Sequence, residues 1–100
     1  MIDWRKIERF EWDAGNERKS VEKHGVSQAE AEQMFFNEPL LLLSDDKHSS
    51  EEVRLHALGQ TDEGRLLQVT FTLRNNDTRI RVISARDMSR KERAFYEQAD

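Results

Sequence analysis

The sequence predicts an α+β fold built on an antiparallel sheet, and three observations support this prediction. Residues 52–59, 65–74 and 78–86 alternate between apolar and polar side chains, which is the two-residue period of a half-buried strand. Short turn-forming segments separate these strands, so we expect them to pair as an antiparallel meander. Capping boxes at residues 27–30 and 89–92 start helices outside the strands, so helices and strands are grouped rather than alternating.

The first part of the chain is predicted to hold one strand and two helices. Residues 7–12 form the strand. Asp13 offers an N-cap for a helix that runs to about His24, and the glycine that follows is its predicted stop. The capping box at residues 27–30 starts the second helix, and Pro39 limits its length.

The second part is predicted to be a four-strand meander and a final helix. Residues 40–43 form a short apolar run that we expect to be a buried strand, followed by a polar loop over residues 44–50. The three alternating strands follow, with turns at residues 61–64 and 75–77. The closing helix continues through Tyr96.

Bulk composition narrows the possible functions. One hundred residues suit a single domain, residues 1–100, with one modest core. The absence of cysteine excludes disulfides, thiolate metal sites and cysteine nucleophiles. No long apolar run follows the N-terminus, so we predict no signal peptide and no membrane span, and we expect a cytoplasmic protein.

Charge is unevenly distributed along the chain, whose net charge is −4. Residues 1–63 carry 8 basic and 15 acidic side chains, which gives −7, whereas residues 64–100 carry 8 basic and 5 acidic side chains, which gives +3. A local basic surface on this acidic protein therefore remains compatible with phosphate binding.

Strand parity gathers the residues that could carry chemistry on the polar face of the predicted sheet. This face holds Glu52, Arg54, His56, Thr70, Thr72 and Arg74, joined by Arg79 and Arg81. Arginine binds phosphate bidentately, and RNA cleavage by the 2′-OH needs a base, an acid and cations around the phosphorane, without requiring a metal. A solvated face with cross-strand ion pairs is the alternative interpretation. Arg86 falls on the opposite parity, and a strand end or a bulge would be needed to bring it to the face.

The two other histidines, His24 and His48, give weaker indications of chemistry. Lys23 and His24 end the first predicted helix, where the helix dipole favours cations, so capping is the alternative to a chemical role. His48 lies beside two aspartates, but the three histidines share no metal-ligand spacing, which favours a surface loop. The sequence therefore predicts no metal site and no cofactor.

Several segments together resemble the BrnT family of toxins. The matching segments are residues 10–13, 23–27 with 30–31, 52–54 with Gly59, 64–65, 79–86, and 92–93 with Tyr96. The resemblance covers about residues 10–97, and residues 1–9 form an extension beyond it. One departure is visible, because many members of the family carry asparagine where this chain has Ser20.

The resemblance implies a RelE-like fold, RNA cleavage and neutralisation by a BrnA-like antitoxin. Such an antitoxin dimerises through a ribbon-helix-helix domain, and the complex would contact DNA only through it. The matched motifs mark Lys23, His24, Glu52, Arg65, Arg81 and Arg86 as catalytic candidates, with Arg54 and Tyr96 as RNA-binding candidates. We expect the arginines to hold the scissile phosphate, and Glu52, His24 or Lys23 to transfer protons. His56 is placed on the face by strand parity and not by the resemblance.

Two functions remain open at this point. The first is a metal-independent endoribonuclease toxin, in which Arg65, Arg81 and Arg86 have no partners in the free protein and the antitoxin covers them with acidic side chains. The second is a non-catalytic partner or corepressor of a DNA-binding antitoxin.

Overall fold

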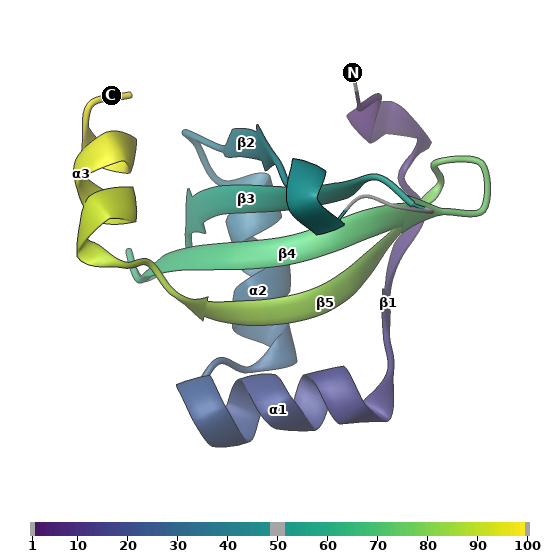
Figure 1. Cartoon of the computed structure of the whole chain (residues 1–100), viewed down its shortest axis with the longest axis horizontal. Coiled ribbons are helices and arrows are strands. Elements are labelled where there is room, and N and C mark those ends of the chain that lie inside the picture. Colours follow the sequence, from purple (N-terminus) through teal and green to yellow (C-terminus); the bar gives the residue numbers. More distant parts are fainter. Residues whose placement is uncertain (1, 49–51, 100) are drawn as a thin grey trace.

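The computed structural model describes residues 2–48 and 52–99, except for the side chains of Glu17 and His48, and residues 49 and 50 of the predicted loop lie outside the described part. In chain order the elements are the 3-10 helix η1 (Trp4–Lys6), β1 (Arg9–Trp12), α1 (Ala14–His24), α2 (Gln28–Gln33), the 3-10 helix η2 (Met34–Phe36), β2 (Leu41–Ser44), the 3-10 helix η3 (Asp46–His48), β3 (Arg54–Gln60), β4 (Leu66–Arg74), β5 (Arg79–Asp87) and α3 (Arg90–Glu97) (Figure 1).

The strands form one five-stranded sheet in the order β1-β5-β4-β3-β2. The α+β class is confirmed, and β2 to β5 pair antiparallel with their neighbours in the sheet. The prediction of a purely antiparallel sheet is wrong at one edge, because β1 pairs in parallel with residues 79–82 of β5. Alternation within a strand shows which face is buried but not which distant strand lies beside it, so this pairing was not visible in the sequence.

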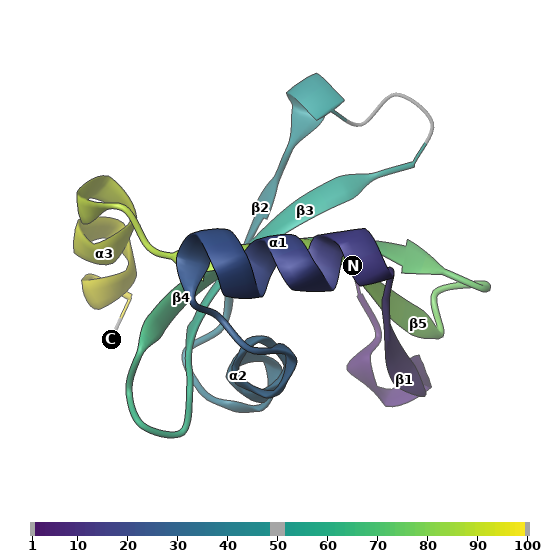
Figure 2. The same cartoon turned by 90° about the horizontal axis from the view of Figure 1, so that it is seen from below.

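The core fills one face of the sheet. Val69 and Phe71 of β4 and Val82 of β5 pack there against Ala31 and Met34, and all five residues are fully buried. In Figure 1, α2 lies behind the sheet and η3 in front of it, and Figure 2 shows these two helices on opposite sides. The face opposite α2 therefore carries the polar side chains of the central strands.

The predicted helix boundaries follow from local chemistry and are confirmed. The Asp13 side chain accepts a hydrogen bond from the Asn16 amide at the start of α1. Gly25 ends that helix with φ at +62°, the left-handed conformation that glycine adopts without a Cβ clash. Both capping boxes form as predicted, with Ser27 opening α2 and Ser89 opening α3.

The expectation of a buried strand over residues 40–43 is wrong. The strand β2 forms there, but it lies at the sheet edge and leaves Leu42 and Leu43 38% and 39% exposed. A run of four leucines has no alternation to distinguish an edge position from a central one. The loop that follows β2 returns over the polar face through η3, which brings Asp45 to the candidate site (Figure 1).

Candidate functional site

The polar sheet face, defined as the side-chain layer of β3, β4 and β5 opposite α2, is organised in cross-strand rows. Thr72 lies opposite Arg81, Thr70 opposite Ser84, and Gln68 opposite Arg86. A register shift between Thr70 and Phe71 inserts one extra residue in β5. This bulge reverses the parity of the strand beyond it. Arg81 and Arg86 therefore lie on one face although they are five residues apart. The bulge is the irregularity that the sequence analysis required to bring Arg86 to this face.

His56 occupies the middle of this face, in the row of Thr70 and Ser84. Its Nε2 lies 3.0 Å from the Asp45 carboxylate, and its Nδ1 lies 2.7 Å from Thr70 Oγ1 and 3.0 Å from Gln68 Nε2. Because a carboxylate only accepts, Nε2 carries a proton that it donates to Asp45. The Asp45 contact holds the η3 loop onto the sheet, and the imidazole is fixed in place with about a quarter of its side chain exposed.

Arg81 and Arg86 flank the His56 row and are both paired with carboxylates. Arg81 Nη2 donates to Asp13 at 3.0 Å, and Arg86 donates bidentately to Glu92 at 2.9 and 3.0 Å. The Arg86 guanidinium lowers the pKa of Glu92, and the Ser89 amide of the capping box adds to this effect. The expectation that these arginines lack partners in the free protein is therefore wrong, because nearby helix-capping carboxylates neutralise them.

Arg65 is the most extensively hydrogen-bonded of the predicted site residues. Its guanidinium donates to both oxygens of Asp87 at 2.8 and 3.1 Å and to Glu30 at 3.1 Å. It also donates to the backbone carbonyls of His24 and Gly25 at 3.2 and 2.9 Å. Arg65 lowers the pKa of Asp87, and the pKa of Arg65 is itself raised, chiefly by Asp87. Arg65 thus joins the end of α1, the start of α2 and the end of β5, and it too has partners in the free protein.

Lys23 and His24 are exposed at the C-terminal end of α1, and His24 contributes to lowering the pKa of Asp87. The helix reaches this position because it follows the outer edge of β5 beyond the part that β1 covers. There the Ala85 amide donates to Ser20 Oγ at 3.2 Å, and Ser20 is only 2% exposed. Ser20, the position that departs from the family pattern, therefore anchors α1 to the sheet.

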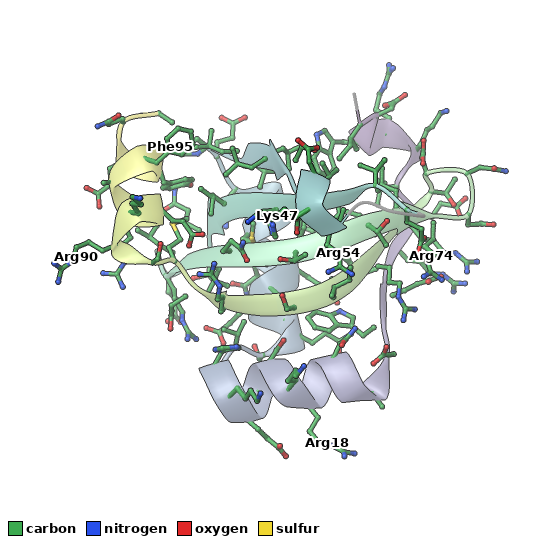
Figure 3. The ribbon with its side chains drawn as sticks, viewed as in Figure 1. Arg18, Lys47, Arg54, Arg74, Arg90 and Phe95 are labelled. Carbon is green, nitrogen blue, oxygen red and sulfur yellow. The ribbon has the colours of Figure 1, made fainter. Side chains whose placement is uncertain are left out.

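Glu52 and Arg54 lie near the other end of the face. Glu52 is exposed and accepts from Arg74 at 2.9 Å, beside the turn that joins β4 and β5. Arg54 lies opposite Thr72 and points over the front of the sheet (Figure 3). Nine residues of extended chain separate Arg65 from Arg74, about 30 Å at strand spacing. The structure therefore does not bring Glu52 together with Lys23, His24 and Arg65.

Tyr96 is buried at the α3 end of the polar sheet face, against Leu58, which points to the same side of β3 as His56. Its ring is 5% exposed and packs in a second small core with Leu58 and Met88. Its hydroxyl donates to the Pro39 carbonyl at 2.5 Å. This hydrogen bond attaches α3 to the segment before β2. In this position Tyr96 packs α3 against the sheet.

Residues 2–48 and 52–99 contain no group of three or more His, Asp or Glu side chains arranged to hold a metal ion. None of the helices in the described part of the chain is long and apolar enough to cross a membrane.

Comparison with known families decides the relationship of this chain. A family profile described as "Ribonuclease toxin, BrnT, of type II toxin-antitoxin system" matches residues 12–92. The chain belongs to the BrnT family. No curated protein sequence matches it.

The fold agrees with this membership. The chain is similar to the crystal structure of the Brucella abortus ribonuclease toxin BrnT, with a TM-score of 0.62 at 21% sequence identity. The similarity covers 82% of this chain and 97% of that one. At this level of identity the similarity shows a shared fold. As a member of a type II toxin family, this chain is expected to have an antitoxin partner and an RNA target.

His56 and Asp45 were the two site residues that the BrnT resemblance missed. Strand parity did place His56 on the polar face, where the structure confirms it. Asp45 gave no signal, because its contact depends on how the loop after β2 folds back over the sheet. The resemblance also missed Arg9, which precedes the residues that the family profile matches. Arg9 pairs with Arg79 and points to the same side of the sheet.

Proposed function

We propose that this BrnT-family chain is a metal-independent endoribonuclease toxin with a RelE-like fold, and that it cleaves RNA on the polar sheet face. The observation that supports the proposal is the bulge in β5, which leaves Arg81 and Arg86 on opposite sides of the His56 row. Two cations around an imidazole are the groups that stabilise a phosphorane and transfer its protons.

The spacing of the two arginines suits one phosphate between them. Thr72 and Gln68, their partners on β4, are four residues apart, so the arginine Cα atoms are about 13 Å apart. A phosphate above the sheet, midway between the two arginines, would lie about 6–7 Å from each Cα along the strand direction. Its height above the sheet adds to this distance, so both arginines must extend to reach it. The phosphate would replace Asp13 as the partner of Arg81 and Glu92 as the partner of Arg86. The side chains of these two arginines are about a quarter and a third exposed.

Candidates for proton transfer lie at three places. Lys23 and His24 lie at the end of α1, beside Arg65 on the α2 side of the sheet, Glu52 lies near the β4–β5 turn, and His56 lies in the centre of the polar sheet face. The two ends are too far apart to act on one phosphate together, so we propose that His56 joins the candidates as the group nearest the reaction. Arg54 is then an RNA contact beside Arg81, and Arg65 acts by fixing the end of α1.

The partner in this proposal is a BrnA-like ribbon-helix-helix antitoxin in the cytoplasm. Because Arg81 and Arg86 already have carboxylate partners, an antitoxin that covers them must supply carboxylates that replace Asp13 and Glu92, or must leave those pairs intact.

A non-catalytic role is the second candidate, and one observation favours it. Each arginine that was expected to hold the phosphate is neutralised by a carboxylate of the chain itself. In that case the chain acts as the partner or corepressor of its antitoxin, and the paired arginines are structural.

A cleavage assay with purified protein and a structured RNA, in excess chelator, separates the two candidates. We expect cleavage by the wild type and a loss of about 100-fold in kcat for Arg81→Ala, as for the removal of one donor from a transition-state site. Arg90→Ala is the control, because Arg90 is exposed on α3 and points away from the sheet (Figure 3). His56→Gln and His24→Gln then show which histidine the reaction requires.

Two results would contradict this proposal. Cleavage that disappears in chelator and returns with a divalent ion would refute metal independence. A folded wild type that cleaves no RNA, alone or on ribosomes, while it binds its antitoxin, would establish the non-catalytic role.

Antitoxin binding supplies a separate test of the shared surface. We expect Arg81→Glu to weaken both RNA cleavage and antitoxin binding, with Arg90→Glu changing neither. If Arg81→Glu abolished cleavage but left the antitoxin Kd within about threefold, about 0.65 kcal/mol, the antitoxin would have to inhibit from another surface.

A further inference from the structure

A row of three arginines crosses the sheet at the end where β4 turns into β5. Arg9 of β1 lies beside Arg79 of β5, and Arg79 lies opposite Arg74 of β4. Paired residues of neighbouring strands point to the same side of a sheet, so the three side chains leave the polar face together. Neighbouring strands are about 4.8 Å apart, and the row therefore spans about 10 Å.

Like charges placed opposite one another on a sheet are unfavourable unless an anion lies between them. This chain supplies two such anions. Glu11 accepts from Arg79 at 2.8 Å, and Glu52 accepts from Arg74 at 2.9 Å. The pKa of Glu11 is lowered by its hydrogen bond to Arg79 and by the charges of all three arginines, so the three guanidiniums act on one carboxylate.

The row retains unused donor groups. Arg9 is exposed and makes no hydrogen bond or ion pair with any residue that the structure describes. The Nε atoms of Arg74 and Arg79 are buried and have no hydrogen-bond partner within that same part of the chain. A guanidinium has five N–H donors, so one carboxylate contact to each of Arg74 and Arg79 leaves Nη donors for an external anion, whereas the buried Nε atoms are out of its reach.

We propose that the Arg9–Arg79–Arg74 row binds a backbone phosphate of the RNA, outside the cleavage centre. The proposal rests on the proposed ribonuclease function and extends the RNA path along the sheet. Arg79 is two residues from Arg81 on the same face, about 7 Å along the strand. A strand of RNA that crosses the His56 row and continues past Arg81 therefore meets this row next.

Arg9 lies before residues 12–92, so it is not among the positions that the family profile matches. A polyanion fits the row better than a single carboxylate does, since a repeating charge can engage cations spaced across successive strands. Phosphate contacts of this kind carry no base information, so we expect the row to add affinity without sequence preference.

RNA binding without cleavage tests the proposal directly. The probe is a fluorescent 2′-O-methyl oligoribonucleotide, which lacks the attacking hydroxyl, and its Kd is measured by anisotropy over a range of salt concentrations. We expect Arg9→Gln to raise the Kd about three- to tenfold and to reduce the salt slope by about 0.7, the value for one single-strand phosphate. Arg9→Lys, which keeps the charge, should restore most of the salt slope.

Arg90→Gln is the matched control, and it should leave both quantities unchanged. If Arg9→Gln behaves like Arg90→Gln while the wild type binds the probe, the row does not bind RNA, and the proposed ribonuclease function is unaffected. If the wild type binds the probe through Arg9 but cleaves no RNA, the row is supported and the cleavage proposal fails. If Arg9→Gln weakens only antitoxin binding, the row serves the protein partner and the RNA proposal is overturned.

Glu11→Gln provides a test with the opposite sign. Removing this carboxylate frees Arg79 and its two neighbours for an external anion, so the probe should bind several-fold more tightly and with a steeper salt slope. Unchanged or weaker binding by a folded Glu11→Gln protein would contradict the proposal.

Discussion

At the α1 end of the sheet, Arg65 donates to two carboxylates and two carbonyl oxygens, whereas at the β4–β5 turn Arg9 has no partner among the described residues. The guanidinium is the same group in both places, and its surroundings differ. Around Arg65, a helix end, a helix start and a strand end converge. Around Arg9, the neighbours in the row are other arginines.

This difference separates arginines that hold the fold from arginines that can bind an external anion. The family resemblance marked Arg65 as a catalytic candidate, and the contacts of its guanidinium hold the end of α1, the start of α2 and the end of β5 together. Arg9 was assigned only to an N-terminal extension, and its position gives it free donors on the polar sheet face. A carboxylate partner alone does not decide the role, since Arg81 and Arg86 are also paired. Arg65 differs from them in joining α1, α2 and β5 to one another.

The largest effect is expected from Arg65→Ala. Removing this side chain breaks its pairs with Asp87 and Glu30 and leaves two carbonyls without their donor. We expect a loss of about 2–3 kcal/mol in the free energy of unfolding, since Arg65 is partly exposed and its bonds are charge-assisted. Urea denaturation measures this loss. A change below about 0.5 kcal/mol would show that the two ends of the face do not differ in this way.

A smaller effect is expected from Ser20→Ala. The variant removes the acceptor for the buried Ala85 amide, at the point where α1 lies on the edge of β5. We expect the free energy of unfolding to fall by about 1–2 kcal/mol. Hydrogen exchange at the Ala85 amide should also accelerate more than at the other amides of β5, which a uniform loss of stability would not produce.

Arg18→Ala is the control for this variant, because Arg18 is exposed on the outward side of α1 (Figure 3). It should leave exchange at the Ala85 amide unchanged. If Ser20→Ala also left that exchange unchanged, Ser20 would not be the anchor of α1 on the sheet.

Acid pH should weaken the α1 end through its carboxylates. The pKa of Asp87 is lowered by Arg65, and the pKa of Glu30 is lowered by the Ser27 amide and then by Arg65. A lowered folded-state pKa gives stability that is present above the unfolded-state pKa and is lost as pH falls through the folded-state value. The urea midpoint should therefore decline below about pH 4. The decline should be shallower in Arg65→Ala, and equal slopes in the two proteins would contradict the assignment.

The smallest effect is expected from Arg9→Ala. The side chain has no partner among the described residues, and its removal relieves repulsion with Arg79. We expect the free energy of unfolding to change by less than about 0.5 kcal/mol. Thermal unfolding measures this change. A large loss of stability would mean that Arg9 supports the fold, and the contrast with Arg65 would then disappear.

Local chemistry allowed parts of this fold to be predicted from the sequence. The residues at Asn75, Asn76 and Asp77 all adopt positive φ in the turn between β4 and β5, as their types favour. The helix caps at Asp13 and Ser27 formed where they were expected. Each of these features depends on a few adjacent residues, so the sequence contains what determines it.

Features that depend on distant contacts were missed. The parallel pairing of β1 with β5 joins residues about 70 positions apart. The alternation of apolar and polar residues within a strand does not indicate which distant strand pairs with it. The parity rule failed for Arg86 because one inserted residue at the bulge shifts every later side chain to the other face. The ion pair of Arg81 was missed because Asp13 lies 68 residues away in the sequence. Glu92 is only six residues from Arg86, and that pair was missed because strand parity had placed Arg86 on the other face.

The parallel pairing of β1 with β5 has a consequence for synthesis of the protein. Residues 9–12 leave the ribosome about 70 residues before their partners at residues 79–82. Closing so long a loop has an entropic cost, and the contacts between β1 and β5 that offset it form only after β5 has been made. A nascent chain that ends before residue 79 therefore lacks Arg79, and the arginine row forms only after β5 has been made.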